Sequence, residues 1–231
     1  MTSNSIPAPA PTSNGVDAVN GTNASSTSIT LRAPSSLPSA SSTPSIPRPA
    51  LSWLSGTWHV THSTLPMWKK NRNVRITYTP VSNTSPAHID DVVTYQPLSS
   101  TKLKTVHGLD KPFSVPGTSD SVSKTGTQNA EGETYASLAY QWRGKGWLMI
   151  ASSKWEILGY GDEAGTGNSW VVTYFAKTLF TPAGVDVYSR KGQLAPTTLE
   201  DIKKALAELG GDVAKLAKEV FEIKMDGDRT D

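Results

Sequence analysis

Cysteine is absent from the 231-residue sequence, which excludes disulfides, thiolate nucleophiles and cysteine-based zinc sites. No apolar run approaches the roughly 18 residues needed to span a bilayer, so no integral membrane contact is expected. The first residues, Met1 to Pro11, alternate small residues with proline and lack the apolar core of a secretory signal. Together with the missing cysteine, these features predict a cytoplasmic protein.

An excess of charge of one sign is also missing. The 22 basic and 20 acidic residues leave a net charge of +2, and the basic residues are dispersed, so we expect no nucleic-acid partner. Histidine is scarce, with four in the chain. His59 and His62 would lie on opposite faces of one strand, which makes them a poor metal pair, and we expect neither a metal nor a cofactor. Nothing in the sequence indicates the oligomeric state.

Residues 1–50 contain no aromatic residue and three charged ones, namely Asp17, Arg32 and Arg48. They hold eight of the 16 prolines and 18 serines or threonines. Burying their larger apolar side chains would contribute about 10–20 kcal/mol, whereas ordering the backbone would cost about 50–100 kcal/mol. We therefore predict a disordered Ser/Thr/Pro-rich tail over residues 1–50, with a linker or targeting segment as the alternative.

The rest of the chain has the composition of one folded domain. All seven tryptophans and all seven tyrosines lie between Trp53 and Tyr188, so a full core is available. We place this domain at residues 51–225 and expect residues 226–231 to fray. Strand patterns, separated by Gly, Pro, Asn and Asp clusters, cover about residues 57–63, 73–79, 91–95, 102–107, 134–143, 147–151, 154–159, 169–175 and 185–189.

The sequence period changes from two to that of a helix near the C-terminus. Thr197 and Glu200 have the spacing of a capping box. Apolar residues follow at helical spacing, at Leu199, Ile202, Leu206 and Leu209. A second short helix over 213–217 and a last strand over 220–223 complete the pattern. The sequence therefore predicts a mainly all-β fold, an antiparallel up-and-down β-barrel with one C-terminal α-helix packed outside. A two-sheet sandwich is the competing fold.

An aromatic residue and a cation mark the two ends of the strand run. Trp58, in a Gly56-x-Trp58 motif, opens the first strand, and Arg190 closes the last long strand. A guanidinium can lie flat on an indole face, a contact worth roughly 0.5–2 kcal/mol. We expect this pair to plug the closed end of a barrel with an internal cavity, which indicates a small-molecule binder.

These residues resemble the lipocalins of the calycin superfamily. The resemblance covers about residues 52–224 and rests on three patterns: Gly56-x-Trp58, Asn73-Val74 followed by Tyr78, and the order of elements from Val185 to Ile223. The last part is closest in pattern to the bacterial outer-membrane lipocalins, although the cysteine that anchors those proteins to lipid is absent. The resemblance implies binding or transport of a fatty-acid-like or lysolipid-like molecule, or of another hydrophobic metabolite, in the barrel cavity.

Side-chain alternation along the predicted strands selects candidate ligand-binding residues. His62 would share a face with Trp58, and His107 would share one with Leu103. The full set of candidates is His62, Trp68, Tyr78, His107, Tyr140, Trp142 and Tyr174. Each of them could instead be an ordinary core residue.

A basic segment lies at the predicted mouth of the barrel. Trp68 would act as a lid there, and Lys69, Lys70 and Arg72 would steer an anionic ligand. The alternative is a solvated run of charge.

A carrier of a hydrophobic small molecule is the first hypothesis for the function. The alternative is a lipocalin-like cyclase or isomerase that orients its substrate, with His62, His107 or a cavity tyrosine as acid or base. No nucleophile elbow, phosphate loop or paired-carboxylate motif stands out. A haem-binding barrel is a remote third hypothesis, in which His62 or His107 would bind iron because no histidine follows His107.

Overall fold

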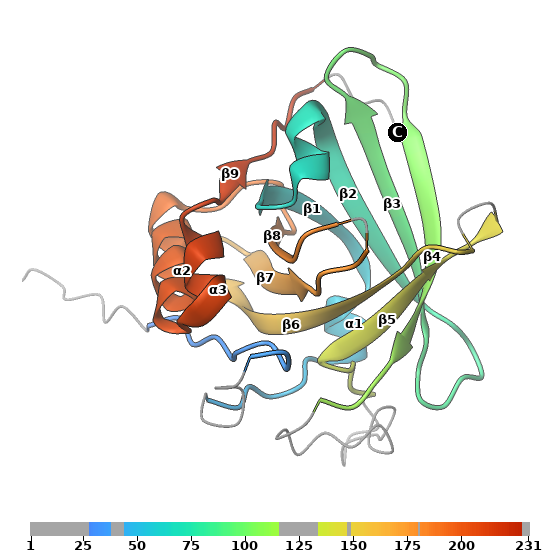
Figure 1. The fold of residues 1–231 in the computed structure, drawn as a ribbon, viewed down its shortest axis with the longest axis horizontal. Helices are drawn as coiled ribbons and strands as arrows, with labels where there is room; N and C mark the ends of the chain where they lie inside the picture. Colours follow the sequence, from blue (N-terminus) through green and yellow to red (C-terminus); the bar gives the residue numbers. More distant parts are fainter. Residues whose placement is uncertain (1–27, 38–43, 116–133, 147–148, 180, 228–231) are drawn as a thin grey trace, which may run out of the picture.

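The computed structural model describes residues 28–37, 44–115, 134–146, 149–179 and 181–227, and one antiparallel sheet dominates it (Figure 1). The strands that form the body of the sheet are β1 (Gly56–Ser63), β2 (Asn71–Pro80), β3 (Ile89–Pro97), β4 (Lys104–Pro112), β5 (Ala139–Gly144), β6 (Ser152–Glu163), β7 (Asn168–Phe175) and β8 (Gly184–Ser189). A short strand, β9 (Phe221–Glu222), follows near the C-terminus.

The sheet closes on itself through β1. Consecutive strands from β2 to β8 are neighbours, β8 pairs with β1, and β1 pairs back with β2. The first half of β1 pairs with β2, for example Trp58 with Ile76, and its end pairs with β9, for example Ser63 with Phe221. The predicted up-and-down barrel is therefore confirmed, and the two-sheet sandwich is wrong.

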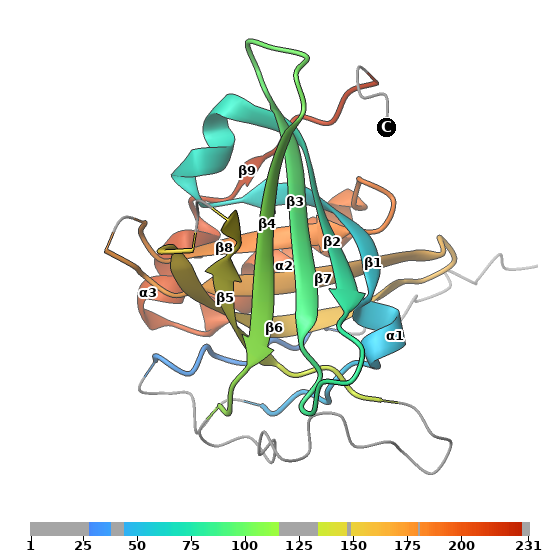
Figure 2. The same cartoon turned by 90° about the vertical axis from the view of Figure 1, so that its right-hand side faces the viewer.

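Short helices lie at the two ends of the barrel. The helix α1 (Leu51–Leu54) precedes β1 at one end, and the 3-10 helix η2 (Pro66–Lys70) joins β1 to β2 at the other end (Figure 2). We call these the closed end and the open end, respectively. The turns between β3 and β4, β5 and β6, and β7 and β8 also lie at the open end, because the strands alternate in direction.

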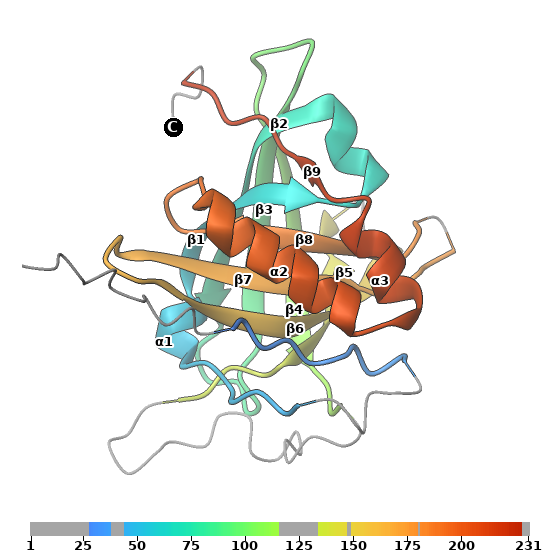
Figure 3. The same ribbon diagram turned by 90° about the vertical axis from the view of Figure 1, so that its left-hand side faces the viewer.

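Two helices cover the outside of the barrel. The helix α2 (Pro196–Glu208) lies across β7 and β8, and α3 (Gly211–Ala217) follows it (Figure 3). Ile202 and Leu206 of α2 are buried in an apolar cluster with residues of β6, β7 and β8. The predicted capping box at Thr197 is wrong, because Pro196 already occupies the first turn. The backbone N–H of Ala195 instead donates to the Glu163 carboxylate at 2.8 Å.

The closed end is plugged by Trp58 and Arg190. The Arg190 guanidinium carbon lies 3.5 Å from the centroid of the Trp58 ring, which is the contact expected from the sequence. Trp58 is fully buried, and its indole N–H donates to the Leu54 carbonyl at 2.8 Å. Arg190 also donates to the backbone carbonyls of Ser55 and Thr57, each at 2.8 Å. One guanidinium therefore ties the end of β8 to the beginning of β1.

Residues 28–37 pack on the outside of the barrel beside α2 and α3 (Figure 3), which differs from the predicted disorder of residues 1–50. Buried Arg32 forms an ion pair with Glu156 at 2.9 Å, and its backbone N–H donates to the Leu158 carbonyl. Leu31 fills the space beside Gly159, where an added Cβ would lie 2.3 Å from the leucine side chain.

Residues 44–50 also have defined contacts. Ala50 forms a β-bridge with Tyr135, and Ile46 is buried in the core cluster of the barrel. The prediction of a fully disordered tail is therefore wrong for 28–37 and 44–50, because it weighed apolar burial alone and left out ion pairs and backbone hydrogen bonds. Residues 1–27 and 38–43, like the predicted frayed end at 228–231, lie outside the described residues.

We expect Trp58→Ala to lower the free energy of unfolding by roughly 3–5 kcal/mol, because the substitution empties a fully buried site. Urea unfolding monitored by circular dichroism measures this loss. Unchanged stability would show that Trp58 does not support the closed end.

Candidate functional site

Three aromatic rings are stacked inside the barrel. The Trp155 ring of β6 lies 4.8 Å from the Tyr140 ring and 5.6 Å from the Tyr78 ring, centroid to centroid. The ring planes are tilted by 23° and 10°, respectively, so both contacts are stacked. All three side chains are buried, and they form a flat-faced apolar wall.

Two carboxyl groups lie beside this wall. Asp91 of β3 is paired across the sheet with Tyr78 on one side and with Gly108 on the other. Asp110 of β4 accepts a hydrogen bond from the Trp155 indole N–H at 2.8 Å. Both side chains are buried, and Oδ1 of Asp91 and Oδ2 of Asp110 have no hydrogen-bond partner among the described residues. Each therefore has one buried oxygen whose hydrogen-bonding capacity the described residues leave unused.

Burial controls the protonation of this acid pair. It raises the pKa of Asp91 to about 7, and the negative charge of neighbouring Asp90 adds to the increase. Burial raises the pKa of Asp110 well above its usual value, and the charge of Asp91 raises it further, against the opposing effect of the Trp155 hydrogen bond. At neutral pH the pair therefore retains a proton, so it can both donate and accept a hydrogen bond.

A third buried carboxyl group, Asp186 of β8, lies nearer the open end. It accepts hydrogen bonds from the Ser63 hydroxyl and, at 3.3 Å, from the Trp68 indole N–H. Burial raises the pKa of Asp186 to about 7, although both hydrogen bonds oppose the increase. Trp68 is buried in the barrel core cluster and meets Tyr95 edge to face at 5.6 Å. This tryptophan therefore covers part of the open end, where the sequence placed it.

Three side chains of β3 and β5 are less buried than the aromatic wall. Val93, Tyr95 and Trp142 pack against the barrel core but are only partly buried. Gly108 makes room for Trp142, because a Cβ at this glycine would lie 1.9 Å from the indole nitrogen. Trp142 is paired across the sheet with Asp110, so this partly exposed indole belongs to the same part of the barrel wall as the carboxyl group.

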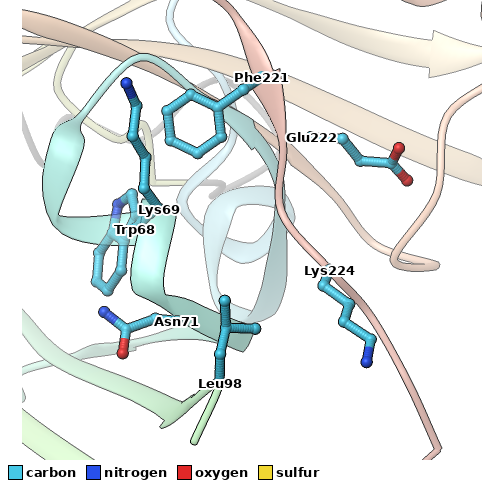
Figure 4. Close-up of a pocket in the computed structure, with 7 residues that line it drawn as sticks. All are labelled: Trp68, Lys69, Asn71, Leu98, Phe221, Glu222 and Lys224. Carbon is cyan, nitrogen blue, oxygen red and sulfur yellow. The ribbon is translucent and has the colours of Figure 1, made fainter.

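A separate pocket of about 330 Å³ lies against the outer side of η2 (Figure 4). It is lined by Trp68, Lys69, Asn71, Leu98, Phe221, Glu222 and Lys224. The Lys69 ammonium group lies 5.5 Å from the centroid of the Phe221 ring. Trp68 thus separates this outer pocket from the barrel interior.

Four of the seven candidates from the sequence are in or at the barrel interior. Tyr78 and Tyr140 are buried in it, Trp142 of β5 is partly buried against it, and Trp68 of η2 is buried at the open end. Whether they contact a ligand stays a prediction. Of the predicted steering cations, Lys69 and Lys70 are exposed, whereas Arg72 is buried in an ion pair with Asp226 at 2.7 Å.

The two histidine candidates do not face the interior. A β-bulge between Val60 and His62 reverses the alternation of β1, so that Ser63 rather than His62 reaches Asp186. The half-buried His62 ring lies near the charges of Glu222 and Lys203, and burial lowers its pKa. His107 is exposed on the outer face of β4. The haem hypothesis therefore loses both of its expected iron ligands.

Tyr174 also faces outward. It belongs to the apolar cluster beneath α2 and lies 3.4 Å, hydroxyl to hydroxyl, from Ser36 of the N-terminal segment. On β7 the inward residues are Val171 and Thr173, whereas Val172 and Tyr174 point to the helix. The candidate is therefore corrected to a core residue between barrel and helix.

The sequence analysis missed the three buried carboxyl groups. Asp186 stands between Val185 and Val187, and Asp91 stands two residues after Ile89, in strands of otherwise apolar character. An acid at an inward position of an alternating strand was the available signal.

Among the described ranges, no group of three or more His, Asp or Glu side chains is placed to hold a metal ion. No helix in the same ranges is both long and apolar enough to cross a membrane.

The closed antiparallel barrel of β1 to β8 with a helix packed outside has the lipocalin-like architecture that the sequence predicts. No family model and no curated protein matches the sequence. Among solved structures, the siderocalin Ex-FABP is similar at 16% identity and a TM-score of 0.44, over 75% of this chain and 95% of that one. Insecticyanin from the tobacco hornworm Manduca sexta is similar at 13% identity and a TM-score of 0.47, over 80% and 86%.

We expect the stability of the protein to decrease between about pH 4 and about pH 7, in part because of Asp91. The folded state binds more protons than the unfolded chain in this range, since the pKa of Asp91 is raised on folding. Asp91→Asn removes the part of this dependence that Asp91 causes and raises the unfolding free energy by roughly 1–3 kcal/mol at neutral to mildly basic pH. Urea titrations across pH measure it, with Asp162→Asn, at an exposed position of β6, as the control. An unchanged slope in Asp91→Asn would show that this carboxyl group is ionised in the folded protein.

Proposed function

We propose that the barrel binds a small, largely apolar molecule that carries a neutral polar group, such as a hydroxyl or a carbonyl. The observation that supports this most directly is the pair of unpartnered carboxyl oxygens on Asp91 and Asp110, next to an aromatic wall. A buried polar atom without a hydrogen bond costs about 1–3 kcal/mol. A ligand that supplies the missing hydrogen bond removes this cost when it binds.

The buried carboxyl groups of the interior favour a neutral hydrophobic ligand over an anionic one. Three buried carboxyl groups, Asp91, Asp110 and Asp186, would repel a carboxylate or phosphate that entered the interior. A neutral ligand group that both donates and accepts hydrogen bonds matches the partly protonated pair of Asp91 and Asp110. A fatty-acid-like molecule could satisfy the same site only with its head group outside, near Lys69 and Lys70. We therefore favour a neutral hydrophobic metabolite.

The apolar part of such a molecule would lie on the rings of Tyr78, Tyr140 and Trp155. Each buried methylene contributes about 0.8 kcal/mol before the costs of binding. Trp142 and Tyr95 are partly exposed and would become covered.

We expect native mass spectrometry of the full chain, purified from its source, to show a stoichiometric adduct that denaturation releases. The released compound should be uncharged and mainly apolar. The double variant Asp91→Asn/Asp110→Asn should bind it about tenfold to hundredfold more weakly, because the protonated pair is lost. Asp162→Asn is the matched control and should bind normally. An anionic adduct, or equal affinity in the double variant, would contradict the proposed role of the pair.

An isomerase or cyclase is the second candidate, and the same acid pair favours it. Asp91, with a pKa of about 7, lies beside a second carboxyl group that shares its environment. Two such groups can remove a proton from one position of a bound molecule and return a proton to another. Here the carboxyl groups would take the acid–base role that the sequence assigned to His62 or His107.

For this candidate, we expect the released compound to take up deuterium at carbon, or to rearrange, when it is incubated with the protein in D2O. The reaction should be lost in Asp91→Asn and retained in Asp162→Asn. Recovery of the unchanged, unlabelled compound would contradict the isomerase or cyclase hypothesis and favour ligand binding alone.

A further inference from the structure

Within the described residues, the large apolar side chains that are exposed all lie in the segments between strands at the open end of the barrel. Four segments connect strands at the open end, and their described residues are 64–70, 98–103, 145–146, 149–151, 176–179 and 181–183. All the large apolar side chains left exposed in the described part of the chain lie in these segments: Met67, Leu98, Leu103, Met149, Ile150 and Leu179. Ile150 is 97% exposed and Leu179 is 89% exposed, so neither supports the core.

The same four segments carry charge of one sign. They contain no aspartate or glutamate, although the chain has 20 acidic residues. They contain five lysines, at positions Lys69, Lys70, Lys102, Lys145 and Lys177. Lys145 is paired with Asp90 of β3, and Glu222 of β9 lines the outer pocket with Lys69. The segments themselves combine exposed apolar side chains with lysines and contain no acidic residue, and the two acids beside them belong to β3 and β9.

We propose that this open-end rim, the four segments just defined, docks on an anionic lipid surface. Apolar side chains flanked by lysines are the combination that binds to the boundary between head groups and acyl chains. A second copy of the chain fits less well, because a symmetric contact would bring the two sets of lysines together. The inference does not depend on which molecule the barrel binds.

The docked orientation would turn the mouth of the barrel toward the bilayer. Trp68 and the partly exposed Trp142 would then lie close to the head-group region. A hydrophobic molecule could pass between bilayer and barrel without crossing bulk water.

Co-sedimentation of the full chain with vesicles tests the proposal. We expect binding to vesicles that mix phosphatidylcholine with phosphatidylserine, weaker binding to phosphatidylcholine alone, and loss of binding as salt is raised. Ile150→Ser combined with Leu179→Ser should weaken binding about tenfold or more without affecting folding. Lys102→Gln combined with Lys177→Gln should weaken it by roughly fivefold per lysine.

A matched control removes the same charge from another face. Lys204→Gln with Lys218→Gln changes two exposed lysines on and just after the outer helices, and binding should persist. Equal weakening by this control pair would indicate general charge attraction and overturn the docking surface. Absence of vesicle binding would also overturn it. So would self-association that is abolished by Ile150→Ser with Leu179→Ser, because the rim would then contact a second copy.

Discussion

The closure of the barrel at β1 determines which side chains lie inside this protein. Because β1 pairs with β8 on one side and β2 on the other, no strand from β1 to β8 can shift without breaking hydrogen bonds with a neighbour. Every second residue of a regular strand then faces inward, whatever its polarity. At Asp91, Asp110 and Asp186 this places carboxyl groups among aromatic rings, where burial raises their pKa. Arg190 strengthens the closure by joining β8 to the first residues of β1.

The regular parts of the fold could be predicted from the sequence because their signals are local. A two-residue period defines β2, and the residues Tyr78 and Tyr140 fall inside the barrel as alternation requires. The prediction for His62 was wrong because the bulge in β1 adds one residue and so turns the His62 side chain to the outer face. Nothing in the sequence marks this bulge. His107 fails because the face of β4 was assigned from Leu103, whereas Gly108 and Asp110 show which face is inward.

Long-range polar contacts could not be predicted from local patterns. Arg32 and Glu156 are 124 residues apart in the chain, and each would be a costly buried charge without the other. Residues 28–37 therefore gain a fixed position from one ion pair and a leucine beside Gly159. The start of α2 is also held by a contact between residues distant in the sequence. The N–H of Ala195 donates to the carboxylate of Glu163 in β6, and the nearby Thr197 does not cap the helix.

The two ends of the barrel differ in how they use apolar surface. At the closed end, Trp58 is fully buried and hydrogen bonded, which maximises stability. At the open end, Ile150 and Leu179 are left in water, and inside the barrel Asp91 and Asp110 each keep an oxygen without a partner among the described residues. The unpartnered carboxyl oxygens lower the stability of the isolated protein, and apolar replacement of Asp91 or Asp110 would remove that cost. These unsatisfied groups support the proposed binding role, because a ligand that supplies the missing hydrogen bonds recovers the free energy that their burial costs.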